Sequence, residues 1–166
     1  MIFGLTLLAF VHVVITLIAM AAGLIAIFGM IGNDRMDRMT AIFLLFTVLT
    51  SATGFLFFPI VKLTPALILG IMSMAVLAVA MAARYLYAMR GAWRWIYVVA
   101  AVIAQYFNSF VLVVQSFLKI PALHTLAPDG GGPVFGVVQG VVLLFYIVIG
   151  TLALRRFRPN RWGRAP

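Results

Sequence analysis

Polar side chains recur at intervals of three or four residues inside an apolar stretch that runs from Trp93 to Leu118. They are Gln105, Asn108, Ser109, Gln115 and Ser116. On a helix, this spacing places them along one face. Amides and hydroxyls in hydrocarbon bond to partners on neighbouring helices, with a net gain of about 0.6 to 2 kcal/mol each. The stripe predicts a helix at the centre of a bundle, and its chemistry is hydrogen bonding.

An imidazole lies deep in the first apolar stretch of the sequence. At 1.5 Å per helical residue, His12 is about 14 Å from the helix end, and Ser73 of a later stretch is about 12 Å from its own end. An ionisable residue at such a depth in the membrane suggests a functional site. We expect a polar layer at this level of the bundle. Its candidate members are His12, Thr50, Ser51, Gln105, Asn108 and Gln139.

Two interpretations of His12 stay open. In the structural one, a neutral imidazole joins helices through a hydrogen bond to Asn108, Gln105 or Thr50. In the functional one, it contacts a ligand. Haem ligation, with Met72 as the second axial ligand, is disfavoured because b-type haem bundles usually supply pairs of intramembrane histidines.

A quinone head group resting against His12, Asn108 and Tyr106 fits the residue types better than haem. Transport of a small solute or proton through the layer is a further possibility. Transporters commonly use carboxylates embedded in the membrane, whereas this chain has no acidic residue in any apolar stretch and no Glu at all. Transport by a single copy is therefore disfavoured.

Cysteine and acidic residues are too few for several kinds of site. The chain has no Cys, which excludes disulfides, thiolate metal sites and iron–sulfur clusters. His124 and Asp129 share a loop, but two such residues are a weak metal signal without a supporting motif. We expect no metal, no cofactor and no catalytic residue, and the sequence favours a protein that is not an enzyme.

The composition requires a bilayer as solvent. Apolar residues make up 66% of the 166 and charged residues 9%, and mean hydropathy is +1.21. About 20 apolar residues cross the hydrocarbon core, and five stretches meet that test. They are Ile2–Ile31, Met39–Phe58, Pro65–Tyr87, Trp93–Leu118 and Val134–Leu154. The prolines lie at or outside these ends, as expected for unbroken helices.

The distribution of Lys and Arg predicts the orientation of the spans. Ten of the 12 cations lie on the side of the first and third loops and of the tail, and only Lys62 and Lys119 lie on the other side. Short loops rich in Lys and Arg stay in the cytoplasm. With five spans, the N-terminus is then outside and the C-terminus is cytoplasmic.

The loops and helix faces carry further expectations. In the tandem Asp-Arg-Met loop, Asp34 or Asp37 should cap the second helix and pair with a nearby Arg. Small residues on each span, such as Gly136 and Gly140 beside Gln139 on the last, should form tight packing faces. The basic tail is expected to fix the orientation of the chain in the membrane and to contact anionic lipid, and nucleic-acid binding is not expected.

The sequence also resembles a known group of proteins. The resemblance rests on the residues at 92–98 and 108–123, on the Leu-Ala-Pro at 126–128 with Gln139, and on His12 with the Thr-Ser-Ala-Thr-Gly-Phe at 50–55. These stretches are similar to those of a widespread group of short, uncharacterised proteobacterial membrane proteins with no assigned activity. The resemblance covers nearly the whole chain and implies the bacterial inner membrane, with no mechanism attached.

These observations predict an all-α, polytopic bundle of five transmembrane helices. Residues 1–154 should form a single helical domain in the membrane, and 155–166 a basic cytoplasmic tail. Two functions stay open. One is a non-enzymatic accessory or assembly component that packs against a membrane-protein partner or a second copy. The other is a protein that handles a ligand, such as a quinone, a small solute or a proton, with the polar layer around His12.

Overall fold

The computed structural model describes residues 6–56, 64–127 and 131–158, and all regular structure within these ranges is helical. The elements are α1 (Leu7–Ile31), α2 (Asp37–Phe55), α3 (Pro65–Met81) with a π-helical segment η1 (Ala82–Leu86), α4 (Trp93–Lys119), α5 (Pro121–His124) and α6 (Pro133–Arg156). Within the described residues, five helices are long and apolar enough to cross a membrane. The prediction of an all-α chain with five apolar helices of membrane-spanning length is therefore confirmed for the described residues.

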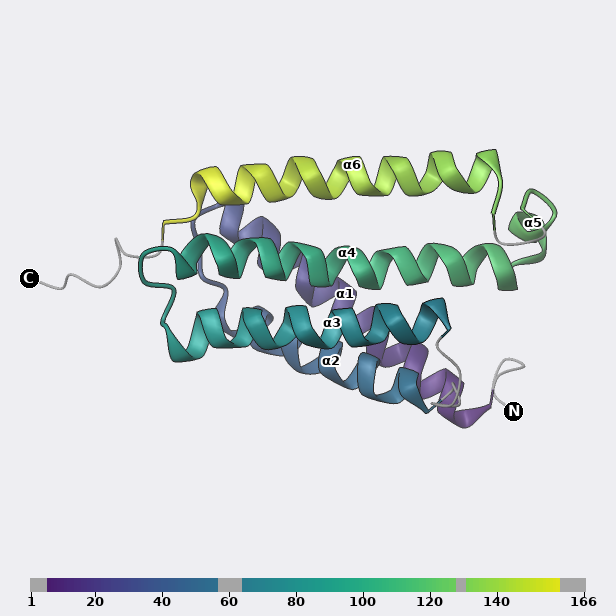
Figure 1. Ribbon diagram of the computed structural model, residues 1–166, viewed down its shortest axis with the longest axis horizontal. Coiled ribbons are helices and arrows are strands. Elements are labelled where there is room, and N and C mark those ends of the chain that lie inside the picture. Colours follow the sequence, from purple (N-terminus) through teal and green to yellow (C-terminus); the bar gives the residue numbers. More distant parts are fainter. Residues whose placement is uncertain (1–5, 57–63, 128–130, 159–166) are drawn as a thin grey trace, which may run out of the picture.

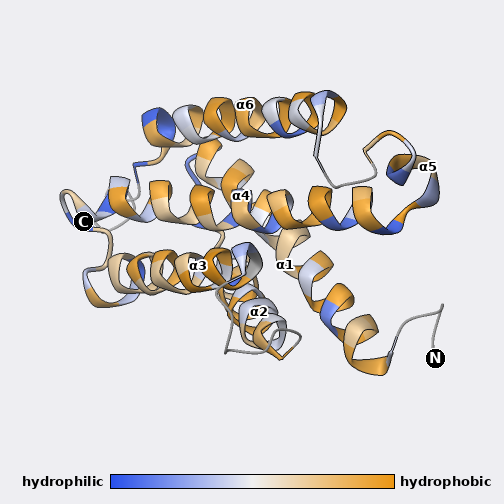
Figure 2. Cartoon of the chain, turned by 45° about the vertical axis from the view of Figure 1, so that its right-hand side comes forward, coloured by the Kyte–Doolittle hydropathy of each residue, from blue (hydrophilic) through white to orange (hydrophobic). Residues whose placement is uncertain are grey.

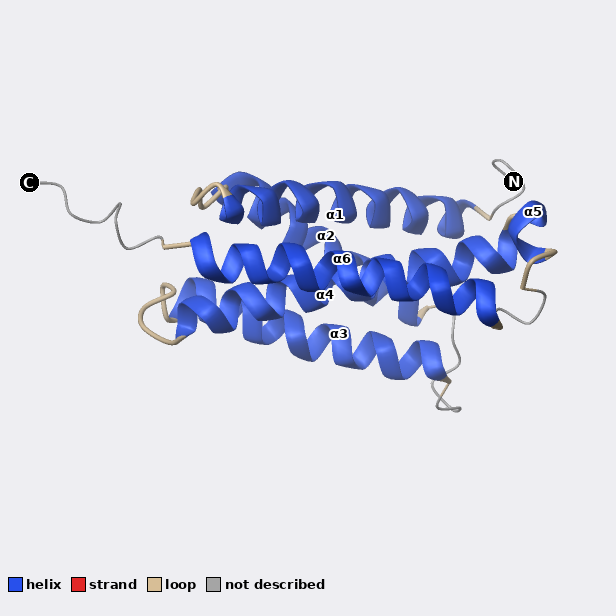
Figure 3. Cartoon of the chain, turned by 90° about the horizontal axis from the view of Figure 1, so that it is seen from above, coloured by secondary structure: helices blue, strands red, loops and turns tan. Residues whose placement is uncertain are grey.

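Helix α4 occupies the centre of the bundle, as its polar stripe predicts. It packs against α1, α3 and α6, while α1 packs along α2 and also contacts α6. Helices α3, α4 and α6 run side by side, and α1 and α2 cross behind them at an angle (Figure 1). The view from above shows α4 between α1 and α3, with α6 lying over it (Figure 3).

The bundle has two chemically different ends. One end, here called the arginine-rich end, contains residues 32–36, 87–92 and 157–158 and is at the left of Figure 1. The other, here called the α5 end, contains the start of α1, the end of α4 and the short helix α5. Because five long helices run alternately up and down, α1 begins at the α5 end and α6 ends at the arginine-rich end.

Helix boundaries differ from the predicted spans in informative ways. Threonine side chains start two helices, since Thr6 accepts from the amide of Ala9 and Thr64 from that of Leu67. The predicted start of the first span, at Ile2, lies outside the described residues. The predicted end of the second span, at Phe58, also lies outside them. Helix α5 was not expected, and the third span ends in a π-helical turn instead of an unbroken α-helix.

The predicted cap of α2 is wrong. The residue at the cap position is Met36, in a left-handed conformation with φ of 43°, and no side chain caps this helix. Asp34 instead accepts a hydrogen bond from the amide of Met36, and Asp37 pairs with Arg35 and Arg84. The predicted Asp–Arg pairing is therefore confirmed, and both carboxylates bind groups other than the free amides of α2.

Apolar side chains cover both the inside and the outside of the bundle. The core contains the fully buried Phe43, Leu77, Tyr97 and Val98. On the outer surface, Val137 is 67% exposed, and hydrophobic colouring predominates along the long helices in the view of Figure 2. A bundle with this surface is compatible with a multi-pass membrane protein, because lipid covers apolar surface that water would not.

Candidate functional site

A cavity of about 400 Å³ opens between α1, α2, α3 and α4 in the half of the bundle toward the α5 end. We call it the four-helix cavity. Its polar lining contains most of the predicted layer, from all four helices. The polar residues are His12, Thr16, Thr50, Ser51, Ser73, Asn108, Gln115 and Lys119. Four of the six predicted members of the layer therefore lie in the lining of one cavity, and they are His12, Thr50, Ser51 and Asn108.

His12 lies on the α1 wall of this cavity and is bonded to α2. Its Nδ1 is 2.7 Å from the hydroxyl of Thr53, one turn beyond the expected partner Thr50. The hydroxyl of Thr16 is 2.8 Å from the backbone oxygen of His12 and 3.4 Å from the hydroxyl of Thr50. The imidazole thus joins α1 to α2, as the structural interpretation expects, while its ring also borders the cavity.

Two more polar pairs bridge the helices around the cavity. The hydroxyl of Ser51 on α2 donates to that of Ser73 on α3 at 3.4 Å, and both residues are buried. The amide of Asn108 on α4 donates to the hydroxyl of Thr47 on α2 at 3.2 Å. These bonds fix the walls, because a buried polar group without a partner is costly in an apolar bundle.

Two predicted members of the layer lie outside the cavity. The amide of Gln105 donates to the backbone oxygen of Met20 on α1 at 2.9 Å, and that of Gln139 on α6 donates to the oxygen of Phe110 at 3.2 Å. Neither residue lines the cavity. In both amides the Oε1 atom is buried and has no partner among the described residues. These two glutamines join α4 to its neighbours.

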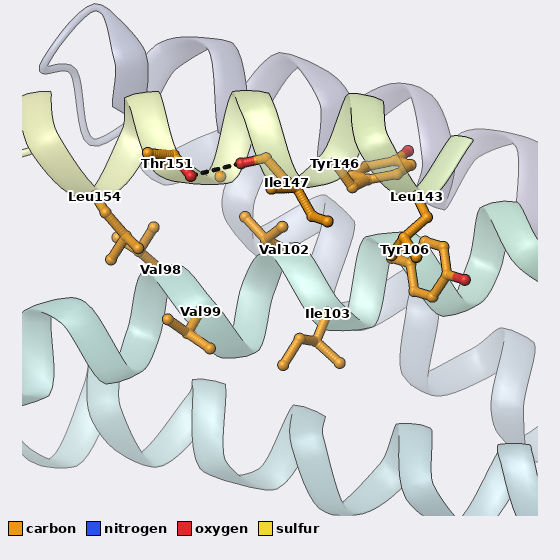
Figure 4. Close-up of a pocket in the computed structure, with 11 residues that line it drawn as sticks. Val98, Val99, Val102, Ile103, Tyr106, Leu143, Tyr146, Ile147, Thr151 and Leu154 are labelled. Carbon is orange, nitrogen blue, oxygen red and sulfur yellow. Dashed lines mark hydrogen bonds between the residues drawn. The ribbon is translucent and has the colours of Figure 1, made fainter. Parts of the chain in front are cut away.

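A second, almost wholly apolar cavity of about 280 Å³ lies between α4 and α6 (Figure 4). It is lined by Val98, Val102, Ile103 and other apolar side chains, with Tyr106 and Tyr146 at one end. Tyr106 therefore faces away from His12, so the predicted grouping of His12, Asn108 and Tyr106 around a quinone is not formed. The hydroxyls of Tyr146 and Ser109 are 2.7 Å apart beside this second cavity.

The residues considered for haem and metal are not brought together. Met72 is 48% exposed on α3 and does not line the four-helix cavity. His124 is exposed in α5, and Asp129 lies outside the described residues. Among the described residues, no group of three or more His, Asp or Glu side chains could hold a metal ion. The groups that the four-helix cavity offers to a ligand are therefore hydrogen-bonding side chains and the amine of Lys119.

The arginine-rich end contains a buried arginine, Arg84, whose burial the sequence interpretation missed. Arg84 in η1 is 4% exposed, pairs with Asp37 on α2 and donates to the backbone oxygen of Arg35 at 3.3 Å. Its guanidinium carbon is 5.2 Å from the ring centroid of Tyr97. Counting Arg84 with the loop cations concealed its burial, although its position inside the predicted third span was the available signal.

The same end holds α6 in place through backbone groups. Nη1 of Arg94 donates to the backbone oxygens of Leu154 at 3.1 Å and of Phe157 at 2.6 Å. The amide of Arg158 donates to the side chain of Asn33 at 2.6 Å. Phe157 is fully buried. The first part of the predicted basic tail, 155–158, is thus attached to the bundle, and 159–166 lie outside the described residues.

Comparison of the chain with family models, with curated proteins and with solved structures gives no match. The function is therefore argued from the geometry of the four-helix cavity.

Proposed function

We propose that this is a five-span integral membrane protein that binds a membrane-dissolved small molecule in the four-helix cavity. The observation that supports this function is the cavity itself, with polar groups from four helices and an apolar rim. Val13, Leu17 and Val111 on that rim are each more than a third exposed, at 38%, 50% and 36%. A molecule dissolved in the bilayer has direct access past such side chains.

The proposed orientation places the arginine-rich end in the cytoplasm. Eight arginines of the described residues, at 35, 38, 84, 90, 94, 155, 156 and 158, lie in or beside its loops. Short loops with this bias stay on the cytoplasmic side. The cavity then lies in the outer half of the bilayer. The resemblance to proteobacterial proteins makes the bacterial inner membrane the proposed location.

Binding fits the geometry better than transport by one copy. The deepest α4 residue that lines the cavity is Phe107, and toward the arginine-rich end the next inward-facing positions, Ala104 and Ala101, are fully buried. Phe43 and Leu77, also fully buried, fill the bundle at that level. No described lining residue is acidic. A solute or proton would need a polar path past this core.

Native mass spectrometry of the detergent-extracted protein tests the proposal. We expect a bound molecule whose mass identifies it as a quinone, a lipid or another compound. Val13→Trp, which puts an indole into the cavity, should abolish the adduct. Val14→Trp is the matched control, because Val14 is 39% exposed and does not line the cavity. A wild-type mass equal to that of the protein alone, or equal adducts in both variants, contradicts the proposal.

A non-enzymatic accessory role is the second candidate, and the exposed face of α6 favours it. A Cβ added at Gly136 or Gly140 would meet no atom within 4 Å, so this small-residue face is unpacked in the single chain. Small residues four apart let two membrane helices approach closely. Gly140→Leu should dissociate a complex built on this face, as measured by native electrophoresis in mild detergent. Migration as a single copy in both wild type and variant contradicts this role.

A further inference from the structure

Among the described residues, the lining of the four-helix cavity has one charged side chain, and it is a cation. This residue is Lys119, the last residue of α4, which is exposed. Among the described residues, no carboxylate forms an ion pair with Lys119. The described acidic residues, Asp34 and Asp37, lie at the arginine-rich end. Among the described residues, the α5 end of the cavity is therefore positive and has no counter-charge beside Lys119.

A second polar group of α4 extends this site inward. Gln115 precedes Lys119 by one turn and also lines the cavity. Residues four apart on a helix are neighbours, so an amide and an amine lie on one side of the same rim. An anionic head group at this rim can accept from both while staying near water. Hydrogen bonds to charged groups are the stronger kind, so the rim favours an anion over a neutral head.

The dimensions of the cavity limit the rest of the ligand. Its lining on α4 runs from Phe107 to Lys119, about 18 Å at 1.5 Å per residue. One extended hydrocarbon chain can lie along a cavity of this length. The walls beside that path are mainly apolar, with Val13, Leu17 and Val111 among them.

We propose that the ligand is an amphiphile with one hydrocarbon chain and an anionic head group. The head binds Lys119 and Gln115 at the α5 end, and the chain lies along α4 toward Phe107. This inference rests on the proposed function, since it names the ligand class of the same cavity. A carboxylate and a phosphate head share the required chemistry, and a fatty acid and a lysophospholipid are its two sources in a membrane.

The test compares probes that differ only in the head group. Hexadecanoate, lysophosphatidylglycerol and neutral hexadecanol are titrated into the delipidated full-length protein, and binding is measured by native mass spectrometry at a pH where the acid is ionised. We expect at least one anionic probe to bind about tenfold more tightly than hexadecanol. Which anion binds more tightly identifies the source of the ligand.

Two substitutions of one residue separate charge from folding. Lys119→Gln should remove the preference for the anion, so that the variant binds hexadecanoate no more tightly than hexadecanol, while Lys119→Arg should keep the preference. Equal binding of acid and alcohol, or a preference that survives Lys119→Gln, overturns the inference but leaves the proposed function intact. If none of the three probes binds, the inference alone fails, because the proposed function also covers a ligand of another class such as a quinone. If all three bind Val13→Trp as well as wild type, the four-helix cavity is not their site and both proposals fail.

Discussion

A single added methyl group at Gly23 tests how tightly α1 and α4 are packed. A Cβ there would lie 2.2 Å from Oε1 of Gln105 and 2.7 Å from Cδ2 of Phe43. A side-chain amide often moves away from such a contact, but Gln105 and Phe43 are both fully buried. The amide of Gln105 is also held by the backbone oxygen of Met20 at 2.9 Å. Gly23→Ala must therefore displace packed side chains and break this hydrogen bond.

The expected cost follows from three contributions. Overpacking a filled core costs about 1 to 3 kcal/mol. Loss of the interhelical hydrogen bond adds about 0.6 to 2 kcal/mol. The better helix propensity of Ala returns about 0.8 to 1 kcal/mol. We expect Gly23→Ala to lower the free energy of unfolding by about 1 to 4 kcal/mol, the sum of these terms.

Equilibrium unfolding in mixed detergent micelles measures this difference, with Gly140→Ala as the matched control. An added Cβ at Gly140 meets nothing within 4 Å, so the control should be neutral or slightly more stable. In a Gln105→Ala background, where the clash with Oε1 is gone, Gly23→Ala should cost at least about 1 kcal/mol less than in wild type. If Gly23→Ala and Gly140→Ala are equally stable, the packing of α1 on Gln105 is refuted.

Three further predictions concern other parts of the bundle. Asp37→Asn should destabilise the protein by about 1 to 3 kcal/mol, because buried Arg84 loses its counter-charge while the 69% exposed carboxylate is partly screened by solvent. Asp34→Asn, which keeps the acceptor for the Met36 amide, should change stability by less than about 0.5 kcal/mol, and equal losses in detergent unfolding contradict the pairing. Tyr146→Phe removes the 2.7 Å contact with Ser109 and should cost about 0.6 to 2 kcal/mol by the same assay; wild-type stability would refute the bond. A reporter that is active only in the cytoplasm should work at the C-terminus and fail at the N-terminus, and activity at both ends contradicts the proposed orientation.

The polar groups of the cavity could be predicted from the sequence because their signal is periodic. Asn108 and Gln115 mark one face of α4, and the depths of His12 and Ser73 follow from helical rise alone. The central position of α4 follows from the same stripe. Helical rise alone places Asn108, His12 and Ser73 at similar depths, so this prediction does not depend on how the helices pack.

The hydrogen-bond partners of these polar side chains could not be predicted in the same way. Gln105 and Gln139 bind backbone oxygens, which every residue carries and no sequence pattern marks. Thr53 bonds to His12 in place of Thr50 because the crossing of α1 and α2 decides which turn of α2 is nearest. The burial of Arg84 could not be predicted from the sequence, because it depends on η1 and on Asp37 from another helix.

Photolabelling in a lipid nanodisc tests the central claim most directly, because it maps where a bilayer molecule contacts the protein. A single-chain alkyl probe with a diazirine near its end is irradiated with the reconstituted protein, and the labelled residues are identified by peptide mass spectrometry. The four-helix cavity predicts labels concentrated at 9–17 on α1 and 107–119 on α4, and lost there in Val13→Trp but not in Val14→Trp. Labels spread evenly over lipid-facing residues such as Val137 and Leu144 of α6, with no excess in the cavity lining, would contradict it.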